Sequence, residues 1–376
     1  MKASLNRDTL FSLIAKAQNI VDKRNTMPVL SNVLIKAKGN TLKLYATDLE
    51  VSIKTHCDAK VAQEGDVVVN AKNFFDILRE LPNSEILLEK QDNHSLHITQ
   101  NTSFFHIHGM DPNEFPVFPG FKDEKFASFS ASLISEMIEK TIYSVSNDKS
   151  RYYLNGVLFE EENQGEGDKT FRMVATDGHR LSLIDRSFSK EGLKLFESGV
   201  IVPKKGLFEI KKLMESANSD EQVEISVDGA QLVLKTKDSL LMIRLIEGKY
   251  PNYKKLLPEA LTHTAVINRE KLMSSLKRVS LLSNQKSKGV TFNFSKGTMT
   301  ILSSSQDLGE AKEDLSVDYE EEDLKIGFNA MYIMDVLSSI EEEEIKMHFN
   351  DQSSPVLLTP LNDKNYTCVV MPMRTV

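Results

Sequence analysis

The segment Thr176–Arg180, which reads Thr-Asp-Gly-His-Arg, places an acid close to a base. Such a pair could act in general acid–base catalysis. Asp and Gly are also favoured in tight turns, so a turn is the other interpretation. No nucleophile or third ligand with convincing spacing accompanies the pair, and the sequence has neither a GxxxxGK[ST] phosphate loop nor a GxGxxG motif that opens a helix after a strand. We therefore expect that the protein is not an enzyme and that none of its residues is catalytic.

Histidines and cysteines, the usual ligands of soft metals, give no zinc signature. Cys57 and Cys368 lie far apart in strand-like runs, which favours small buried side chains over a disulfide framework or a metal site. Four histidines fall within two strands that are expected to pair, and we interpret them as decoration of a hairpin. The four are His94, His97, His106 and His108. Neither a metal nor a cofactor is expected.

Composition and charge limit the classes to which the protein can belong. The chain has 376 residues, of which 40% are hydrophobic and 27% charged, as in soluble globular proteins. No apolar run approaches the roughly 18 residues that span a bilayer, and no signal-peptide core is present, so we expect a cytoplasmic protein with no membrane partner. The net charge of -8 argues against a tight grip on nucleic acid. It does not argue against a protein that encircles nucleic acid and keeps its basic residues on one surface.

Three segments repeat one pattern, in which a strand ends, a helix begins and an acidic residue follows an apolar pair. They are residues 69–78, 202–211 and 328–337, with Asp76, Glu209 and Asp335 at the matching position. The interval between them is on the order of 130 residues, the size of a whole small domain. The sequence therefore predicts three similar domains, which favours a ring or an arc.

A further helix opens each repeat. Its N-cap candidates are Asn6 in the first repeat, Ser130 or Ser132 in the second and Asn268 in the third. Apolar residues follow at a spacing of three to four, which is typical of an amphipathic helix lying on a sheet. They are Leu10, Ile14, Ala17 and Val21; Leu133, Met137, Ile138, Ile142 and Val145; and Leu272, Leu276 and Val279.

The remaining residues alternate as β-strands do. Gly39-Asn40, Asp228-Gly229 and Lys296-Gly297 interrupt the runs where hairpin turns belong. We predict an α+β fold of three domains, 1-122, 123-259 and 260-376, each with two helices packed on antiparallel sheets.

Basic residues recur on the expected helices of all three repeats. Any single Lys or Arg could simply solvate an outer helix face. Recurrence across several helices instead favours one shared surface that meets phosphates, and the absence of a base-reading motif predicts sequence-independent contact.

Four motifs, in order and at matching spacing, give the chain a family resemblance. They are Arg151–Gly156, Val174–Leu181, Tyr250–Tyr253 and Val369–Arg374. With them the chain resembles, over essentially its whole length, the beta subunit of bacterial DNA polymerase III, the sliding clamp. The resemblance implies a head-to-tail homodimer whose six domains of the DNA-clamp type form a ring around duplex DNA. Such a processivity factor tethers the replicative polymerase in DNA replication without catalysis of its own.

The resemblance also implies two sets of contacts. The family binds the clamp loader, the polymerase and other proteins through short linear clamp-binding motifs, in an apolar pocket between the second and third domains. The residues matching DNA-contacting positions or lying next to them are Arg24, Lys72, Lys149, Arg151, Tyr152, Tyr153, Lys204 and Lys205. Those matching the peptide pocket are Leu154, Thr176, Gly178, His179, Arg180, Leu181, Pro251, Lys255, Leu256, Val370, Met371, Pro372, Met373 and Arg374. Lys255 stands where the family often has Arg.

The dimer contact departs from the family pattern. Family members pair basic residues on the edge strand of the first domain with acidic residues of the third, but residues 100–108 contain no Lys or Arg. We hypothesise that apolar contacts replace these ion pairs and that protonated His106 or His108 adds positive charge at lower pH. The expected dimer residues are Phe104, His106, Leu281, Leu282, Asp307, Glu310 and Glu313.

A repeat-built interaction scaffold that never touches DNA is the remaining alternative. It would explain a peptide pocket and the acidic charge, but it leaves the basic helices unexplained. Retention on circular DNA separates the two, because only a clamp stays on such DNA and slides off once the DNA is cut.

Overall fold

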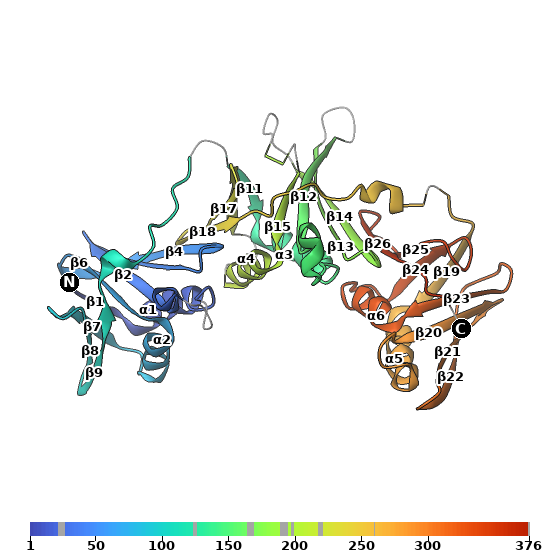
Figure 1. Ribbon diagram of the computed structural model, residues 1–376, viewed down its shortest axis with the longest axis horizontal. Coiled ribbons are helices and arrows are strands. Elements are labelled where there is room, and N and C mark those ends of the chain that lie inside the picture. Colours follow the sequence, from blue (N-terminus) through green and yellow to red (C-terminus); the bar gives the residue numbers. More distant parts are fainter. Residues whose placement is uncertain are drawn as a thin grey trace. The chain divides into compact units, whose positions relative to one another are not determined.

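The computed structural model describes residues 1–21, 27–122, 126–163, 169–188, 195–196, 199–216, 221–258 and 260–374. The chain divides into two compact units (Figure 1). Unit 1 comprises Met1–Ser135 and Lys205–Leu245, and unit 2 comprises Glu136–Lys204 and Ile246–Val376. The central repeat therefore supplies residues to both units.

Unit 1 is built on two antiparallel sheets. The larger sheet joins the first repeat to the second where β4 pairs with β18, with Val51 opposite Ile243. Its strands, in spatial order, are β10 (Gly109–Met110), β6 (Gly65–Asn70), β2 (Asn32–Lys38), β3 (Thr41–Thr47), β4 (Val51–Asp58), β18 (Ser239–Arg244), β17 (Gln231–Lys235), β16 (Gln222–Asp228) and β11 (Ala127–Ser130). The smaller sheet has the order β5 (Lys60–Gln63), β1 (Lys2–Asn6), β7 (Glu85–Lys90), β8 (Leu96–Gln100) and β9 (Ser103–Ile107).

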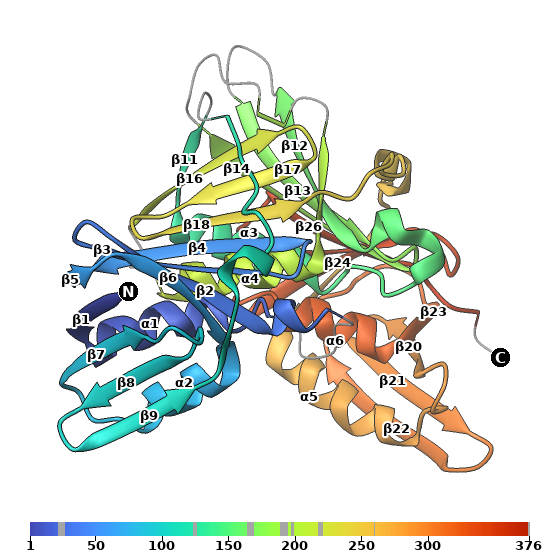
Figure 2. The ribbon, with the colours of Figure 1, turned by 60° about the vertical axis from the view of Figure 1, so that its left-hand side comes forward.

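Two capped helices cover these sheets. α1 (Arg7–Ala17) begins after Asn6, whose side chain accepts a hydrogen bond from the Asp8 N–H at 2.8 Å. α2 (Ala71–Glu80) is capped in the same way by Asn70. The two helices lie side by side (Figure 2), and stacking of Phe11 on Phe75, with ring centroids 4.9 Å apart, joins them. The cap at Asn6 is therefore confirmed, but α1 ends before Val21, which the apolar spacing had placed on the same helix face.

α4 (Lys204–Ser216) packs closely on the large sheet of unit 1. A Cβ atom at Gly206 would lie 2.5 Å from Cγ2 of Ile243 in β18, so the helix can approach the strand this closely only because residue 206 has no side chain.

Unit 2 repeats the arrangement with one sheet of eight strands and one of four. The larger sheet joins the second and third repeats where β14 pairs with β26, with Arg180 opposite Val370. Its order is β15 (Val200–Pro203), β12 (Gly156–Asn163), β13 (Lys169–Thr176), β14 (Arg180–Phe188), β26 (Tyr366–Val370), β25 (Val356–Pro360), β24 (Glu344–Phe349) and β19 (His263–Asn268). The smaller sheet has the order β22 (Gly309–Ser316), β21 (Thr298–Ser305), β20 (Gly289–Ser295) and β23 (Leu324–Asn329).

The helices of the second and third repeats also begin at polar caps. The Leu133 N–H donates to the Ser130 hydroxyl at 3.3 Å at the start of α3 (Ala131–Ile142), so Ser130 rather than Ser132 caps this helix. Asn268 caps α5 (Arg269–Val279) as expected, and Asn329 caps α6 (Ala330–Ser338). Short 3-10 turns are η1 (Pro28–Ser31), η2 (Pro112–Glu114), η3 (Lys149–Leu154), η4 (Tyr253–Leu256) and η5 (Ser280–Leu282).

The three hairpin turns expected from the sequence are confirmed. Gly39, Gly229 and Gly297 have φ values of 60°, 57° and 72°, the left-handed region that these turns require. The expectation for the cysteines is right only in part, because Cys368 is buried in β26 but Cys57 in β4 is half-buried. The edge strand expected over residues 100–108 is also shorter, since β8 ends at Gln100 and β9 covers only Ser103–Ile107.

Candidate partner-binding and DNA-contacting surfaces

The pairing of β14 with β26 brings together two of the sequence motifs. Leu181 lies opposite Val369, and the Met371 N–H donates to the His179 carbonyl at 2.8 Å. Residues from the turn before β14 and from the segment after β26 therefore lie side by side in unit 2, although almost two hundred positions of sequence separate them. These are the two longest runs among the predicted peptide-pocket residues.

An apolar cluster underlies this meeting point. Of the predicted pocket residues, Leu154 and Leu181 belong to its buried part and Leu256 packs against it half-buried. The other members were not among the predicted pocket residues. They come from six strands, which are β12, β13, β14, β15, β25 and β26, from η3, and from residues 246–257, which include η4. The buried members outside the pocket prediction are Leu158, Val174, Leu183, Ile201, Tyr250, Tyr253 and Val369, and the half-buried ones are Tyr153, Ile246, Leu257 and Leu357.

The acidic and basic residues of the Thr176–Arg180 segment, Asp177 and His179, form part of a tight turn. The Asp177 carboxylate accepts hydrogen bonds from the backbone N–H groups of His179, at 2.9 Å, and Arg180, at 3.0 Å. Gly178 has a φ of 89°, and a Cβ atom there would lie 2.7 Å from a guanidinium nitrogen of Arg151. His179 is exposed and stacks on Tyr332, with ring centroids 6.1 Å apart. The geometry supports the turn interpretation of this segment.

Hydrogen-bond acceptors and aromatic rings of its own chain surround the Arg180 guanidinium. Its guanidinium donates to Asp177 at 3.2 Å, to Asp335 of α6 at 2.5 Å and to the carbonyl of Tyr143 at 2.6 Å. The rings of Tyr143 and Tyr332 lie 5.4 and 4.7 Å from its central carbon. Each of the three guanidinium nitrogens thus has a partner, so Arg180 fixes the turn to Asp335 of α6.

The other pocket candidates have different exposures. Thr176 is buried, and its N–H donates to the Tyr250 hydroxyl at 3.0 Å. Val370 is fully buried, whereas Pro251 and Lys255 are exposed. Met371 is half-buried beside the turn.

The last three pocket candidates turn toward a polar hollow of about 460 Å³ rather than the apolar cluster. The Met373 N–H donates to the carbonyl of Gly327 at 2.8 Å, which fixes the segment to β23. Two cations, Lys325 and Arg374, lie in the wall of the hollow. Its lining residues are Lys325, Gly327, Gln352, Ser353, Pro372, Met373 and Arg374. The predicted pocket list therefore covers two adjoining surfaces, one apolar and one cationic.

Tyr253 carries a polar network at the edge of the apolar cluster. Arg172 donates to both carboxylate oxygens of Asp185 at 2.7 Å and to the Tyr253 hydroxyl at 3.1 Å. Burial raises the pKa of the Tyr253 hydroxyl, and its hydrogen bond to Glu160 adds to the rise. The motif Tyr250–Tyr253 did single out both tyrosines, but nothing local in the sequence identifies the strands against which they pack.

The basic residues expected to touch DNA fall in both units. In unit 1, Lys72 pairs with Asp76 at 2.6 Å on α2, and Lys205 of α4 pairs with the buried Asp48. In unit 2, Lys149 is exposed on η3, and Arg151 pairs with Asp148 at 3.0 Å.

The remaining members of the DNA set lie beside these. Tyr152 is exposed, and Tyr153 beside it is half-buried, with the two rings edge to face at 5.8 Å. Lys204 is half-buried, and burial, followed by the charge of Arg180, lowers the pKa of its ammonium group. Arg24 lies outside the described residues. Of the five described cations, Lys72 and Lys149 are exposed, whereas Arg151, Lys204 and Lys205 are half-buried.

The residues expected at the dimer contact lie on two edge strands, in the turn before one of them and in η5. Among the described strands β9 ends its sheet in unit 1 and β22 ends its sheet in unit 2. Phe104 of β9 is 58% exposed and Leu281 of η5 is 75% exposed, both unusual for such large apolar side chains. Leu282 follows Leu281 in η5, and Asp307 and Glu310 lie in or next to the turn between β21 and β22. Glu313 accepts hydrogen bonds from Arg278 and Ser275, so part of its charge is neutralised within the chain.

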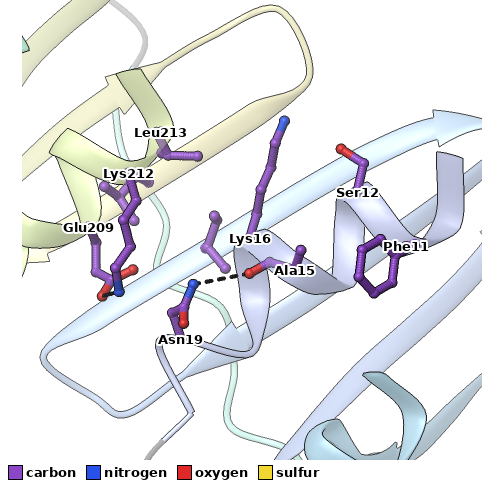
Figure 3. Close-up of a pocket in the computed structure, with 10 residues that line it drawn as sticks. Phe11, Ser12, Ala15, Lys16, Asn19, Glu209, Lys212 and Leu213 are labelled. Atoms are coloured by element: carbon purple, nitrogen blue, oxygen red, sulfur yellow. Dashed lines mark hydrogen bonds and ion pairs between the residues drawn. The ribbon is translucent and has the colours of Figure 1, made fainter. Parts of the chain in front are cut away.

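A second, apolar hollow lies within unit 1. It has a volume of about 230 Å³ and is formed by α1 and α4 above β4 and β18 (Figure 3). Its two lysines are held by acids, Lys212 by Glu209 at 2.9 Å and Lys16 by Asp238 at 2.6 Å. The lining residues are Phe11, Ser12, Ala15, Lys16, Asn19, Ile53, Glu209, Lys212, Leu213 and Leu241.

The described part of the chain has neither a three-ligand metal cluster nor a membrane-spanning helix. No group of three or more His, Cys, Asp or Glu residues there is arranged to hold a metal ion. No helix in that part is long and apolar enough to cross a membrane.

Comparison with known proteins places this fold in a family. Models of the N-terminal, central and C-terminal domains of the DNA polymerase III beta subunit match residues 1–119, 129–252 and 254–374. The beta sliding clamp of Pseudomonas putida is 32% identical over 375 residues, a match that covers 100% of each chain.

Solved structures agree with these matches. The beta sliding clamp of C. crescentus superposes with a TM-score of 0.93 at 31% identity. The clamp of Bartonella birtlesii, solved bound to griselimycin, superposes with a TM-score of 0.94 at 28% identity. Both comparisons cover all of each chain.

The fold therefore defines a DNA sliding clamp, with three similar α+β domains as the sequence predicted. The chain belongs to the bacterial DNA polymerase III beta subunit family, the beta sliding clamps. Members of this family are non-catalytic processivity factors in DNA replication that assemble as homodimeric rings and tether partner proteins. The family assignment made from the four sequence motifs is confirmed. The exact domain boundaries at residues 122 and 259 stay a prediction.

Proposed function

We propose that this clamp, with no catalytic activity of its own, works in the cytoplasm and carries its partners through a peptide site in unit 2. The observation that supports the proposal is the pairing of β14 with β26, which sets the 177–179 turn beside Met371 at the apolar cluster. The partners are the replicative polymerase, the clamp loader and other proteins with short linear clamp-binding motifs.

The chemistry of this surface selects an apolar peptide anchor. Tyr153, Ile246 and Leu256 are half-buried against the cluster, and such partly covered side chains can close around an inserted apolar residue. Met371 adds a flexible thioether chain that adapts to different anchors. Arg180, which three hydrogen bonds hold within the chain, forms a rigid wall, while Arg374 is exposed and can meet an acidic group of the peptide.

Fluorescence anisotropy of a labelled clamp-binding peptide from a replicative polymerase tests this site. Met371→Ala should weaken binding about tenfold, since losing roughly half of a buried Met contact costs about 1.4 kcal/mol. Met331→Ala is the matched control, because Met331 is 44% exposed on α6 in the same unit, and its removal should leave affinity unchanged. Griselimycin, which the Bartonella birtlesii clamp binds, should compete with the peptide. Equal affinity of the peptide for both variants would refute the site.

We further propose that duplex DNA is contacted without sequence preference by cations of both units. Exposed lysines such as Lys149 and Lys72 would give weak, salt-sensitive contacts to phosphates, which suits sliding. Arg151, Lys204, Lys205 and the exposed ring of Tyr152 complete the described part of this surface, with Tyr153 beside it.

The proposed homodimer contact joins the edge strand β9 of one copy to the β22 edge of another. Phe104 and Leu281 supply exposed apolar area on the two edges. Asp307 and Glu310 supply negative charge, which has no lysine or arginine opposite it on β9. The contact is therefore expected to be more apolar than charged, and weakly dependent on salt.

A further inference from the structure

Two histidines of the small sheet in unit 1 meet across neighbouring strands. The β8–β9 register places His97 directly opposite His106, and Nε2 of His97 lies 3.1 Å from Nδ1 of His106. The buried residues of these strands, such as Ile98 and Ile107, point to the opposite face of the sheet. Both imidazoles therefore lie on the solvent-facing side, with His106 exposed.

We propose that His97 and His106 form a two-imidazole chelate for a divalent transition-metal ion. Two nitrogens that each lie about 2.05 Å from a tetrahedral ion are roughly 3.3 Å apart. The observed 3.1 Å separation is therefore close to the bite distance of a metal, without movement of the backbone. In the metal-free protein the same nitrogens share one proton in a hydrogen bond.

The surroundings of the pair favour ligand geometry. The edge of the Phe104 ring packs against His97, with centroids 4.8 Å apart, and restricts rotation of that imidazole. On the other side the ring of His108 lies 4.9 Å from that of His106, measured between the ring centroids. Beyond His97 the register continues to Glu89, which pairs with Lys2 at 3.3 Å. Across strands β9, β8 and β7, this face of the sheet therefore carries His106, His97 and Glu89 in that order.

The donor set defines the class of ion. Imidazole nitrogen suits Zn²⁺, Ni²⁺ and Cu²⁺, whereas Mg²⁺ and Ca²⁺ prefer oxygen ligands. Because the described residues of a single chain place no third ligand at coordination distance, water completes the coordination sphere there. The ion joins β8 to β9 at the sheet edge that carries Phe104, so its binding stabilises this hairpin.

Isothermal titration calorimetry on the full-length, untagged protein tests the proposal with Ni²⁺ as the probe. The wild type should bind one equivalent per chain, and His97→Gln and His106→Gln should each abolish that binding. His56→Gln is the matched control, because His56 is an exposed histidine on β4 of the same unit, opposite Lys43 rather than another imidazole. Cys57→Ser should bind Ni²⁺ as the wild type does, and this result would show that the half-buried Cys57 thiol is not the ligand.

A second measurement guards against misfolded variants. Ni²⁺ should raise the midpoint of thermal unfolding of the wild type and of His56→Gln, but not of His97→Gln or His106→Gln. The metal-free midpoints and circular dichroism spectra of all four proteins should agree. Retained one-to-one Ni²⁺ binding in either His97→Gln or His106→Gln, or equal response of the wild type to Mg²⁺, would overturn the proposal.

Discussion

Replacing Arg180 by alanine should loosen the turn that borders the peptide site. The side chain is 10% exposed and donates to two carboxylates and a backbone carbonyl, at 3.2, 2.5 and 2.6 Å. Removing one partner of a buried ion pair costs about 3–5 kcal/mol, because the acids keep their charge without a cation. Asp335 is 38% exposed and can recover water, so we place the loss at the lower end, about 3 kcal/mol.

The assay is thermal and urea unfolding of the variant beside two others. A loss of about 3 kcal/mol corresponds to a decrease of roughly 6–12 °C in the unfolding midpoint of unit 2. Arg180→Lys should lose most of the same stability, because one ammonium group cannot span three separated acceptors. Arg79→Ala is the control for an exposed arginine that pairs with two acids, and it should cost less than about 1 kcal/mol.

Amide hydrogen exchange locates the effect. In Arg180→Ala, exchange should rise in the 177–179 turn and at the start of β14, while β20 and β21 stay protected. The reasoning is refuted if Arg180→Ala and Arg79→Ala have unfolding midpoints within about 1 °C of each other. It is also refuted if Arg180→Lys is as stable as the wild type.

Three further results are expected. Burial, with the charges of Asp58 and Asp238 adding to it, raises the pKa of the Cys57 thiol to about 11. Alkylation of Cys57 by iodoacetamide at pH 8 should therefore be roughly 100-fold slower than that of a free thiol, and its rate should increase with pH up to about 11. A rate that stays constant between about pH 8 and 10 would contradict this expectation. Burial opposes ionisation of Glu136, but hydrogen bonds from Arg186 and Lys140 outweigh this effect and lower the pKa of the carboxyl group. The ionised Glu136 therefore stabilises the fold above its unfolded-state pKa of about 4.3, and this stabilisation is lost as the pH falls through the lower pKa of the folded state. Glu136→Gln should therefore show a smaller loss of stability between pH 5 and pH 3 in urea unfolding, and an unchanged acid dependence would count against the pairing. Phe104→Ala should raise the dimer dissociation constant at least tenfold in analytical ultracentrifugation, because burying such a ring contributes about 2 kcal/mol, and an unchanged constant would remove β9 from the interface.

Local features of the fold were predictable because local chemistry determines them. Asn6 and Asn268 cap helices because their side chains accept from backbone N–H groups two or three residues later. Gly39 and Gly229 mark hairpins because those turns need left-handed backbone, which glycine adopts without strain. Helix ends were less accurate, since α1 stops four residues before Val21 although the apolar spacing continues.

Contacts between distant segments were not predictable from the residues alone. Nothing local to Arg180 indicates that β14 will pair with β26 or that Asp335 will receive its guanidinium. The family resemblance supplied the pocket residues as a set, but it did not show that Arg180 makes three hydrogen bonds within the chain. His97 and His106 are nine positions apart in the sequence, and only the strand register shows that they face each other.

Retention on DNA is the most direct test of the clamp function. The full-length protein, fluorescently labelled and assembled by a clamp loader on a singly nicked circular plasmid, is separated from free protein by gel filtration. We predict that the clamp elutes with the circular DNA and is released when a restriction enzyme linearises the plasmid, while a nuclease-free control stays bound. Elution as free protein before cutting, or equal retention on circular and linear DNA, would contradict a topological clamp.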